Sequence, residues 1–322
     1  MDILVSINCT TYNHEKYIAQ ALDSFLMQET NFAWEILVHD DASTDGTAPI
    51  IKSYAERYPD IIRPMFQNEN QHSLGIKVNT TYNIPRSRGK YIAWCDGDDY
   101  WTDPFKLQKQ ADYMENNPVC SLCLTRSGLF REDQQRPAGF IRPYNESRII
   151  PREDIILRKG ISHISSLFFR KDCLKEPPAF YLDGPMGDYF LIIFLALKGD
   201  AYYIDEHMSD YRINVPNSWM QLNFKGSNDQ RIWLNKEILK KLQNLNIYTD
   251  FRYADIIRPW QAECEQAIIF AQGNLSGLRD NKYIGKDPGN ILPLAAKFYL
   301  YKYWPELYFQ FRRINRNLKK LF

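Results

Sequence analysis

Three carboxylates follow a short apolar run in the stretch "YIAWCDGDDYW", residues 91–101. Asp96, Asp98 and Asp99 are so close in sequence that each raises the pKa of the others unless a cation or hydrogen bonds offset the charge. Carboxylate oxygens suit Mg²⁺ or Mn²⁺, which share their coordination with water and substrate phosphates. The pattern indicates a divalent-cation site, with Asp98 as the better ligand; a solvated acidic turn is the alternative.

A second acidic turn, "HDDASTDGT", occupies residues 39–47. Asp40 and Asp41 end an apolar run, and a carboxylate there can accept the N–H of a uracil ring. The turn superficially resembles a calcium loop, but Lys52 stands where that loop requires Glu, so calcium is excluded. Ordinary turn chemistry and helix capping remain the alternative.

A third polar segment, "TTYN", follows the first apolar run. The Thr10 hydroxyl and the Tyr12 ring can contact and stack on a base, and Asn13 can cap the next helix. The chain contains neither GxxxxGK[ST] nor GxGxxG, which excludes P-loop NTPases and dinucleotide-binding Rossmann proteins. A Gly-rich basic loop, as sugar nucleotidyltransferases require after the first strand, is also missing.

The elements that position these turns alternate between strand and helix patterns. Strands are expected at residues 3–7, 35–39, 61–65 and 91–95, with helices at 18–26, 50–55, 75–84 and 103–114. Such alternation predicts an α/β fold with a mostly parallel, helix-covered sheet. Ligands bind beyond the carboxyl ends of parallel strands, so the three polar turns should share one rim.

The second half of the chain adds further elements. Strands are expected at 119–124, 165–169, 201–204 and 208–213, a charged connection at 126–148 and a buried helix at 187–199, before a purely helical pattern from about 228. We therefore expect a catalytic domain over residues 1–222 and a helical region over 223–322.

Charge divides between these two regions. Residues 223–322 hold 17 Lys/Arg and 9 Asp/Glu, a net charge of +8, which leaves 23 and 30, a net of −7, for residues 1–222. An acidic first region argues against a nucleic-acid partner there. In residues 305–322 basic side chains flank an apolar stripe, which fits either peripheral contact with an anionic membrane or packing on the protein.

Cysteine use and apolar runs indicate a cytoplasmic protein. Cys120 and Cys123 form a lone CxxC without a second pair or a nearby His, so core thiols are expected rather than a zinc or redox site. No basic segment followed by a long apolar one begins the chain. The longest apolar run, 189–197, is too short to span a bilayer as a helix.

Four motifs together resemble inverting family 2 glycosyltransferases of the GT-A fold, of the bacterial cell-surface polysaccharide type. They cover roughly residues 2–220 and occur in the family's order: "VSINCTTYN", "DDASTDGT", "RGKYIAWCDGDDYW" and "GDYFL". The resemblance implies transfer of a sugar from a UDP-sugar to a hydroxyl of a glycan or lipid-linked saccharide. It also implies Mn²⁺ or Mg²⁺ as cofactor, and a location in the cytoplasm or on the inner face of the plasma membrane.

The resemblance assigns roles to the motif residues. The donor nucleotide would be bound by Thr10, Tyr12, Asn13, Asp40, Asp41, Asp96 and Gly97. Asp98 and Asp96 would hold the cation, and Asp188 would be the general base that activates the acceptor hydroxyl. Helix capping is the alternative for Asp188. Many relatives have a His where this chain has Asn214.

Four further residues are candidate contacts of the diphosphate or acceptor. They are Lys90, Trp101, His163 and Arg212. A solvated loop, core packing, a structural histidine and an internal ion pair are the respective alternatives.

Two other functional classes compete with the glycosyltransferase. An aspartyl phosphotransfer enzyme would need Thr or Val where Tyr100 follows the acids. A non-catalytic nucleotide-sugar or glycan-binding protein would keep the pocket without the chemistry. Donor sugar, acceptor, linkage and oligomeric state are not encoded in any local pattern.

Overall fold

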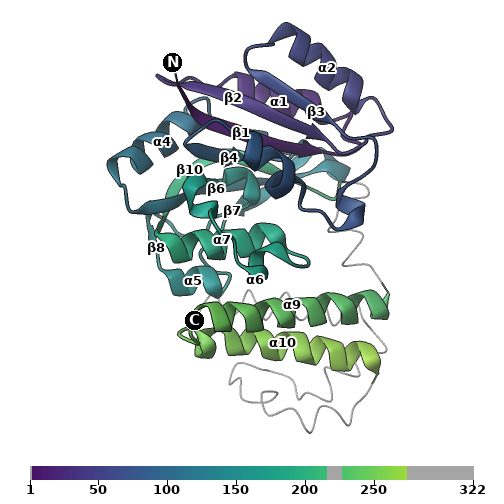
Figure 1. The fold of residues 1–322 in the computed structure, drawn as a ribbon, viewed down its shortest axis with the longest axis vertical. Helices are drawn as coiled ribbons and strands as arrows, with labels where there is room; N and C mark the ends of the chain where they lie inside the picture. The colour runs from purple at the N-terminus through teal and green to yellow at the C-terminus, as the bar shows by residue number, and fades with distance from the viewer. Residues whose placement is uncertain (1, 216–226, 274–322) are drawn as a thin grey trace. The chain divides into compact units, whose positions relative to one another are not determined.

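The computed structural model describes residues 2–215 and 227–273, which fall into two compact units (Figure 1). The first unit, which carries the sheet, contains residues 2–182 and 186–215. The second contains 183–185 and the helices from 227 to 273. The boundary expected at residue 222 and the basic segment 305–322 lie outside the described residues.

The first unit is built on one curled, ten-stranded sheet with the order β3-β2-β1-β4-β9-β6-β10-β5. These strands are β3 (Ile62–Phe66), β2 (Ala33–Asp40), β1 (Ile3–Thr11), β4 (Tyr91–Trp94), β9 (Phe168–Arg170), β6 (Cys120–Arg131), β10 (Asp200–Ile213) and β5 (Tyr100–Trp101). Off this path, β7 (Arg136–Ile141) pairs with β6 and β8 (Arg148–Ile150) pairs with β10.

Strand directions confirm the predicted α/β class. Strands β1, β2, β3, β4, β6 and β10 run the same way. Pro64 lies in β3, an edge strand, where its missing N–H costs little. As predicted, β1, β2 and β4 end on one rim, which brings the three polar turns together.

Two predictions about the second half were wrong in detail. The strands expected at 201–204 and 208–213 are one continuous strand, β10, with register irregularities between residues 204 and 209. The charged connection 126–148 instead contains the end of β6, all of β7 and the start of β8. Strand β9 lies antiparallel between β4 and β6, a pairing that local periodicity does not specify.

The longer helices of the first unit lie where the apolar spacing indicates: α1 (Ile18–Leu26), α2 (Thr47–Arg57), α4 (Lys106–Asn116) and α7 (Gly187–Lys198). The structure also contains the short helices α3 (Ile84–Arg86), α5 (Arg152–Ile156) and α6 (Ala179–Leu182), of which α5 and α6 were not predicted. Helix α7 buries every residue from 189 to 196. The helix expected at 75–84 is a π-helical turn, Asn79–Asn83, that leads into α3.

In the second unit the structure describes the helices α9 (Asn228–Tyr248) and α10 (Ala254–Gln272), which pack on each other. Ser227 and Gln230 form a reciprocal capping box at the start of α9. The predicted stripe of α9 is buried at Leu234, Ile238, Leu242 and Leu245. Within residues 2–215 and 227–273, no helix is long and apolar enough to cross a membrane.

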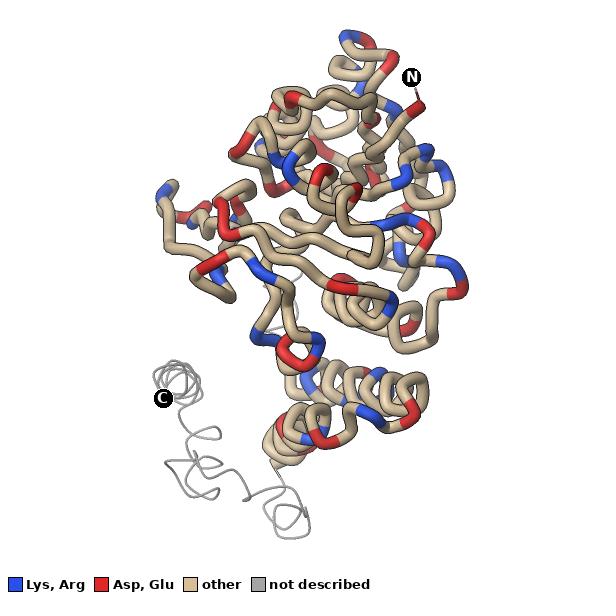
Figure 2. Tube along the Cα trace, turned by 90° about the vertical axis from the view of Figure 1, so that its left-hand side faces the viewer, with Lys and Arg blue, Asp and Glu red and all other residues tan. Residues whose placement is uncertain are grey.

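Buried side chains confirm the expected core thiols. Cys120 and Cys123 are buried and free, and burial raises the pKa of Cys120 to about 12, so it stays protonated. Figure 2 shows acidic and basic residues interspersed along the described part of the chain.

Candidate active site

Asp96 follows β4 at the carboxyl-end rim. Its Oδ1 accepts hydrogen bonds from the Thr10 hydroxyl at 2.5 Å and from the Trp94 indole at 3.1 Å. Burial raises the pKa of Asp96 to about 6, and the charges of Asp98 and Asp188 act in the same direction. The strand β1 therefore fixes this carboxylate through Thr10.

Gly97 allows the acidic turn to lie directly against β1. Its N–H donates to the Thr10 carbonyl at 2.8 Å. A Cβ at this position would lie 2.8 Å from Thr11 Cβ and 3.0 Å from Ile18 Cδ1. The predicted nucleotide contact is thus a buried glycine whose lack of a side chain lets Asp96 and Asp98 sit at the end of the sheet.

Asp98 has 20% of its side chain accessible, whereas Asp99 is buried. Oδ2 of Asp98 lies 3.9 Å from Nε2 of His14, which comes from the loop after β1. Asp98 therefore combines solvent access with a nearby imidazole nitrogen.

Asp99 connects the acidic turn to Arg212 and His163. It is 2% exposed, accepts the Arg212 N–H at 2.9 Å through Oδ1, and places Oδ2 3.3 Å from Nδ1 of His163. Burial, reinforced by Asp98, raises the pKa of Asp99, while burial lowers the pKa of His163 to about 3. The His163 ring stacks on Tyr211 with centroids 3.7 Å apart, which holds the histidine in place.

The guanidinium of Arg212 is engaged by other groups of the protein. It donates to the Asp98 carbonyl and to Gln20 Oε1, and Nε lies 3.5 Å from Glu132 Oε2. The side chain also covers the rings of Tyr17 and Tyr100. Arg212 therefore fastens β10 to the acidic turn and to α1, in keeping with the internal ion-pair alternative.

Asp188 begins α7 and is exposed. Its charge raises the pKa of Asp96 and, together with those of Asp99 and Asp98, adds to the burial that raises the pKa of Tyr211 to about 12. These effects place Asp188 electrostatically close to the acidic turn, although it lies 92 residues after Asp96. A Cβ on the preceding Gly187 would lie 2.7 Å from Lys77 Nζ, so the Lys77 ammonium lies against the start of α7.

The turns after β1 and β2 are hydrogen-bonded to each other. Asn13, at φ 55°, accepts the Thr44 N–H at 2.8 Å through Oδ1, and Ser43 accepts the Asn13 N–H at 2.9 Å. Asn13 therefore joins two loops, and the prediction that it caps α1 was wrong. Tyr12, in contrast, is 43% exposed and available for stacking.

Asp40 and Asp41 lie at the end of β2 and are almost fully buried. Asp40 accepts a hydrogen bond from the Ser43 hydroxyl, and burial raises its pKa. Asp41 accepts the backbone N–H groups of Gln71 at 2.8 Å and His72 at 3.0 Å. Asp41 thereby shapes the loop that follows β3.

Two predicted contacts lie away from the acidic turn. Trp101 is 2% exposed, donates its indole N–H to the Ser165 carbonyl at 2.9 Å and packs in the core. Lys90 precedes β4, at the opposite end of the strand from Asp96, and pairs with Glu115 at 2.6 Å. At about 3.3 Å per residue, the length of β4 separates Lys90 from the acids. We therefore leave both out of the site.

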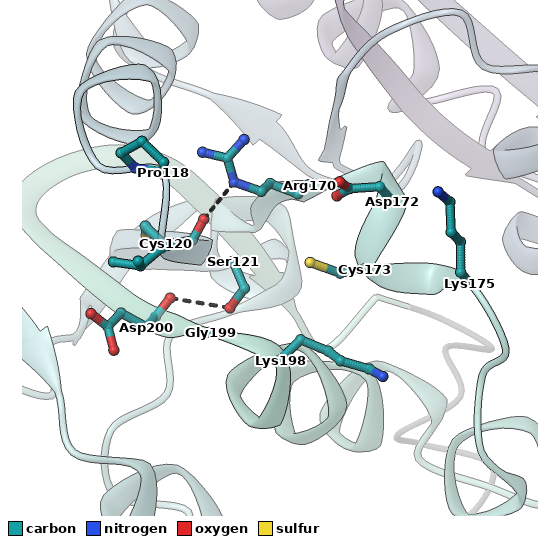
Figure 3. A pocket seen from close by; sticks show the side chains of 11 residues that line it. Pro118, Cys120, Ser121, Arg170, Asp172, Cys173, Lys175, Lys198, Gly199 and Asp200 are labelled. Atoms are coloured by element: carbon teal, nitrogen blue, oxygen red, sulfur yellow. Dashed lines mark hydrogen bonds between the residues drawn. The ribbon is translucent and has the colours of Figure 1, made fainter.

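A pocket of about 440 Å³ opens at the amino ends of β6 and β10 (Figure 3). The acidic turn lies at the opposite, carboxyl ends of the parallel strands. Its polar groups bind one another: Arg170 Nε donates to the Cys120 carbonyl at 2.8 Å and the Ser121 hydroxyl to the Asp200 carbonyl at 3.1 Å. The pocket contains none of the sequence-predicted site residues.

Two residues near the acids were missed by sequence reasoning. His14 and Tyr211 flank the predicted motifs, inside "TTYNHE" and "SDYRIN", but neither has a spacing that signals chemistry. Their proximity to the acids depends on the meeting of β1, β4 and β10 at one rim. Asn214, at φ 65°, donates to Asp133 Oδ1 at 3.0 Å and is directed to the turn before β7.

The donor set fits a hard divalent cation. Asp98 is accessible, and Asp96 engages its Oδ1 with Thr10 and Trp94. In the part of the chain that the structure describes, no group of three or more His, Cys, Asp or Glu side chains is already gathered as metal ligands. One or two protein ligands completed by phosphate and water is the arrangement that Mg²⁺ usually has.

Comparison with known proteins identifies the family. The sequence profile of Glycosyl transferase family 2 matches residues 6–173. An uncharacterized protein of Mycobacterium tuberculosis is 35% identical over 215 residues, 67% of this chain and 60% of the relative. The putative glycosyltransferase EpsE of Bacillus subtilis is 38% identical over 148 residues, 46% of this chain and 51% of EpsE. The chain thus spans between half and two thirds of the length of these relatives.

Solved structures share the fold. S. aureus TarS in complex with UDP-GlcNAc has a TM-score of 0.57 at 15% identity, covering 99% of this chain and 92% of TarS. The mannosyltransferase PcManGT from Pyrobaculum calidifontis, in complex with GDP-Man and Mn²⁺, has a TM-score of 0.56 at 18% identity, covering 98% and 85%. At these identities the likeness shows the GT-A fold alone. Because the profile matches more than half of the 322 residues, the chain belongs to glycosyl transferase family 2.

Proposed function

We propose that this protein is an inverting glycosyltransferase that moves a sugar from a UDP-sugar to a hydroxyl of a glycan or lipid-linked saccharide. The observation that carries the proposal is the meeting of the acidic turn with Asp188: the charge of Asp188 reaches Asp96 from a different element. A carboxylate able to act as base would thus lie near the carboxylates that hold the cation, as sugar transfer from a nucleotide diphosphate requires.

A uridine nucleotide fits the turns after β1 and β2. The exposed Tyr12 ring offers a stacking surface, and Asp40 places a carboxylate at the rim that can accept an N–H of uracil. The complexes of TarS with UDP and with UDP-GlcNAc support this choice of donor class. The complex of PcManGT with Mn²⁺ supports use of a divalent cation.

The chemical step is a direct displacement. Asp188 takes the proton of the acceptor hydroxyl as its oxygen bonds to the anomeric carbon, while the bond from that carbon to the UDP oxygen breaks with its electron pair. Attack from the face opposite UDP inverts the anomeric centre. A divalent cation held by Asp98, with Asp96 beside it, would supply charge stabilisation for the departing diphosphate. Thr10 and Arg212 keep the turn that carries these acids in position.

The Asp188→Asn variant tests the proposal. It should bind UDP and Mn²⁺ with wild-type affinity and lose transfer by at least about 100-fold, because the amide cannot accept the proton. The readouts are isothermal titration with UDP and product detection with a panel of UDP-sugars and saccharide acceptors. Asp112→Asn, on the exposed side of α4, is the matched control. Unchanged transfer by Asp188→Asn would refute its role, and failure of the wild type to bind any UDP-sugar would favour another donor.

A further inference from the structure

We propose that His14 is a ligand, together with Asp98, for the divalent cation, and that it makes the site prefer Mn²⁺ to Mg²⁺. The inference rests on the proposed function, because it concerns the same cation. His14 Nε2 and Asp98 Oδ2 are 3.9 Å apart, and both side chains are about one fifth exposed. That distance is too long for a hydrogen bond between them.

A shared cation accounts for this separation. Ligands that lie about 2.1 Å from one ion are about 3 Å apart at right angles and about 4 Å apart when nearly opposite. The His14–Asp98 distance falls within this range. Nε2 is the ring nitrogen of His14 that faces Asp98, while Nδ1 is buried and makes no hydrogen bond in the described chain.

The backbone holds His14 firmly. Its N–H donates to Thr47 Oγ1 at 2.8 Å, and its carbonyl accepts the N–H groups of Tyr17 and Ile18, each at 2.9 Å. The neighbouring Glu15 N–H donates to Asp45 Oδ2 at 3.1 Å. A ligand fixed in this way loses little conformational entropy when it binds an ion.

A second chain of contacts ties the two ligands together. The His14 ring packs edge-on against Tyr17, with centroids 6.2 Å apart. The guanidinium of Arg212 lies 5.0 Å from the centre of that Tyr17 ring and donates to the Asp98 carbonyl. The loop after β1 and the acidic turn after β4 are therefore positioned as one assembly.

The ligand chemistry leads to the metal preference. Mg²⁺ takes oxygen ligands and resists replacement of its waters, whereas first-row transition ions accept imidazole nitrogen. A site of one carboxylate and one imidazole, completed by diphosphate oxygens and water, should therefore bind Mn²⁺ better than Mg²⁺.

Electron spin echo spectroscopy of the full chain with Mn²⁺ and UDP tests the proposal directly. Wild-type protein should show nitrogen coupling from a coordinated imidazole, and His14→Gln should lose it. The variant should bind Mn²⁺ about tenfold more weakly, while its Mg²⁺ affinity should change much less. His207→Gln removes the histidine of another His–Asp pair, 2.7 Å from Asp210, and should keep both the coupling and the affinity.

The outcomes separate the inference from the proposed function. Bound Mn²⁺ without nitrogen coupling in the wild type would refute His14 as a ligand and leave the cation in place. No Mn²⁺ binding by the wild type in the presence of UDP would refute the cation itself, and the inference with it. Because the coupling is read on the wild type, a His14→Gln variant that does not fold leaves the test intact.

Discussion

Gly97 sets how closely the acidic turn approaches β1. Its would-be Cβ meets the Cβ of Thr11 and the end of Ile18, both within the packed core, so the neighbours have little room to move. We predict that Gly97→Ala lowers the free energy of unfolding by about 1–3 kcal/mol and weakens binding of UDP with Mn²⁺, since Asp96 and Asp98 must shift. Urea unfolding and calorimetric titration measure the two effects. Wild-type values in both would show that the turn tolerates a side chain.

Arg212 acts on the acids through the backbone. Lysine cannot reproduce a planar fork that reaches the Asp98 carbonyl and Gln20 while covering two aromatic rings. We predict that Arg212→Lys loses about 1–3 kcal/mol of unfolding free energy and weakens binding of UDP with Mn²⁺.

The matched control for Arg212 is Arg142→Lys, an exposed arginine that pairs with Asp205. It should leave both quantities unchanged, because exposed pairs contribute little. Equal effects of the two substitutions on UDP binding would contradict a specific role for Arg212.

At the scale of elements, helix α4 carries a fully buried lysine beneath the site. Lys106 Nζ donates to Gln110 Oε1 at 2.7 Å and lies 4.3 Å from the centre of the Trp101 ring. Burial lowers its pKa to about 7, whereas an unfolded lysine has a pKa of about 10.4. Between these values the unfolded chain binds one more proton than the folded chain, so the free energy of unfolding should rise with pH.

We predict that Lys106→Met removes this rise. From pH 7 to pH 9 the wild type should gain unfolding free energy relative to the variant, by on the order of 1 kcal/mol per pH unit. Urea unfolding at pH 7, 8 and 9 measures the difference, and Lys52→Met on the exposed face of α2 is the control. Parallel pH profiles of the unfolding free energy for wild type and Lys106→Met would mean that the fold does not lower the pKa of Lys106.

At the scale of the whole molecule, charge is divided between an acidic sheet-bearing region and a basic C-terminal region. We predict that removal of residues 305–322, with their five Arg/Lys around an apolar stripe, abolishes binding to anionic phosphatidylglycerol vesicles. Vesicle sedimentation measures it, with neutral vesicles and retained UDP binding as controls. Undiminished sedimentation of the truncated chain would assign membrane contact elsewhere.

The sequence by itself determined the α/β class, the strands β1 to β4, the helices α1 and α2, and the rim on which the polar turns meet. It could do so because apolar periodicity and turn residues are local, and because parallel strands end on the same edge. The buried stripe of α1 and the apolar run of α7 could be predicted for the same reason.

Only the tertiary structure decided which side chains share the site. Asp98 meets Arg212 across 114 residues, and Asp99 meets Arg212 across 113. Trp101 and Lys90 are near the acids in sequence yet lie in the core and at the other end of β4. His14 stands beside Asp98 because β1 pairs with β4 in parallel. Strand order and register arise from long-range packing of the whole sheet, and no local spacing records them.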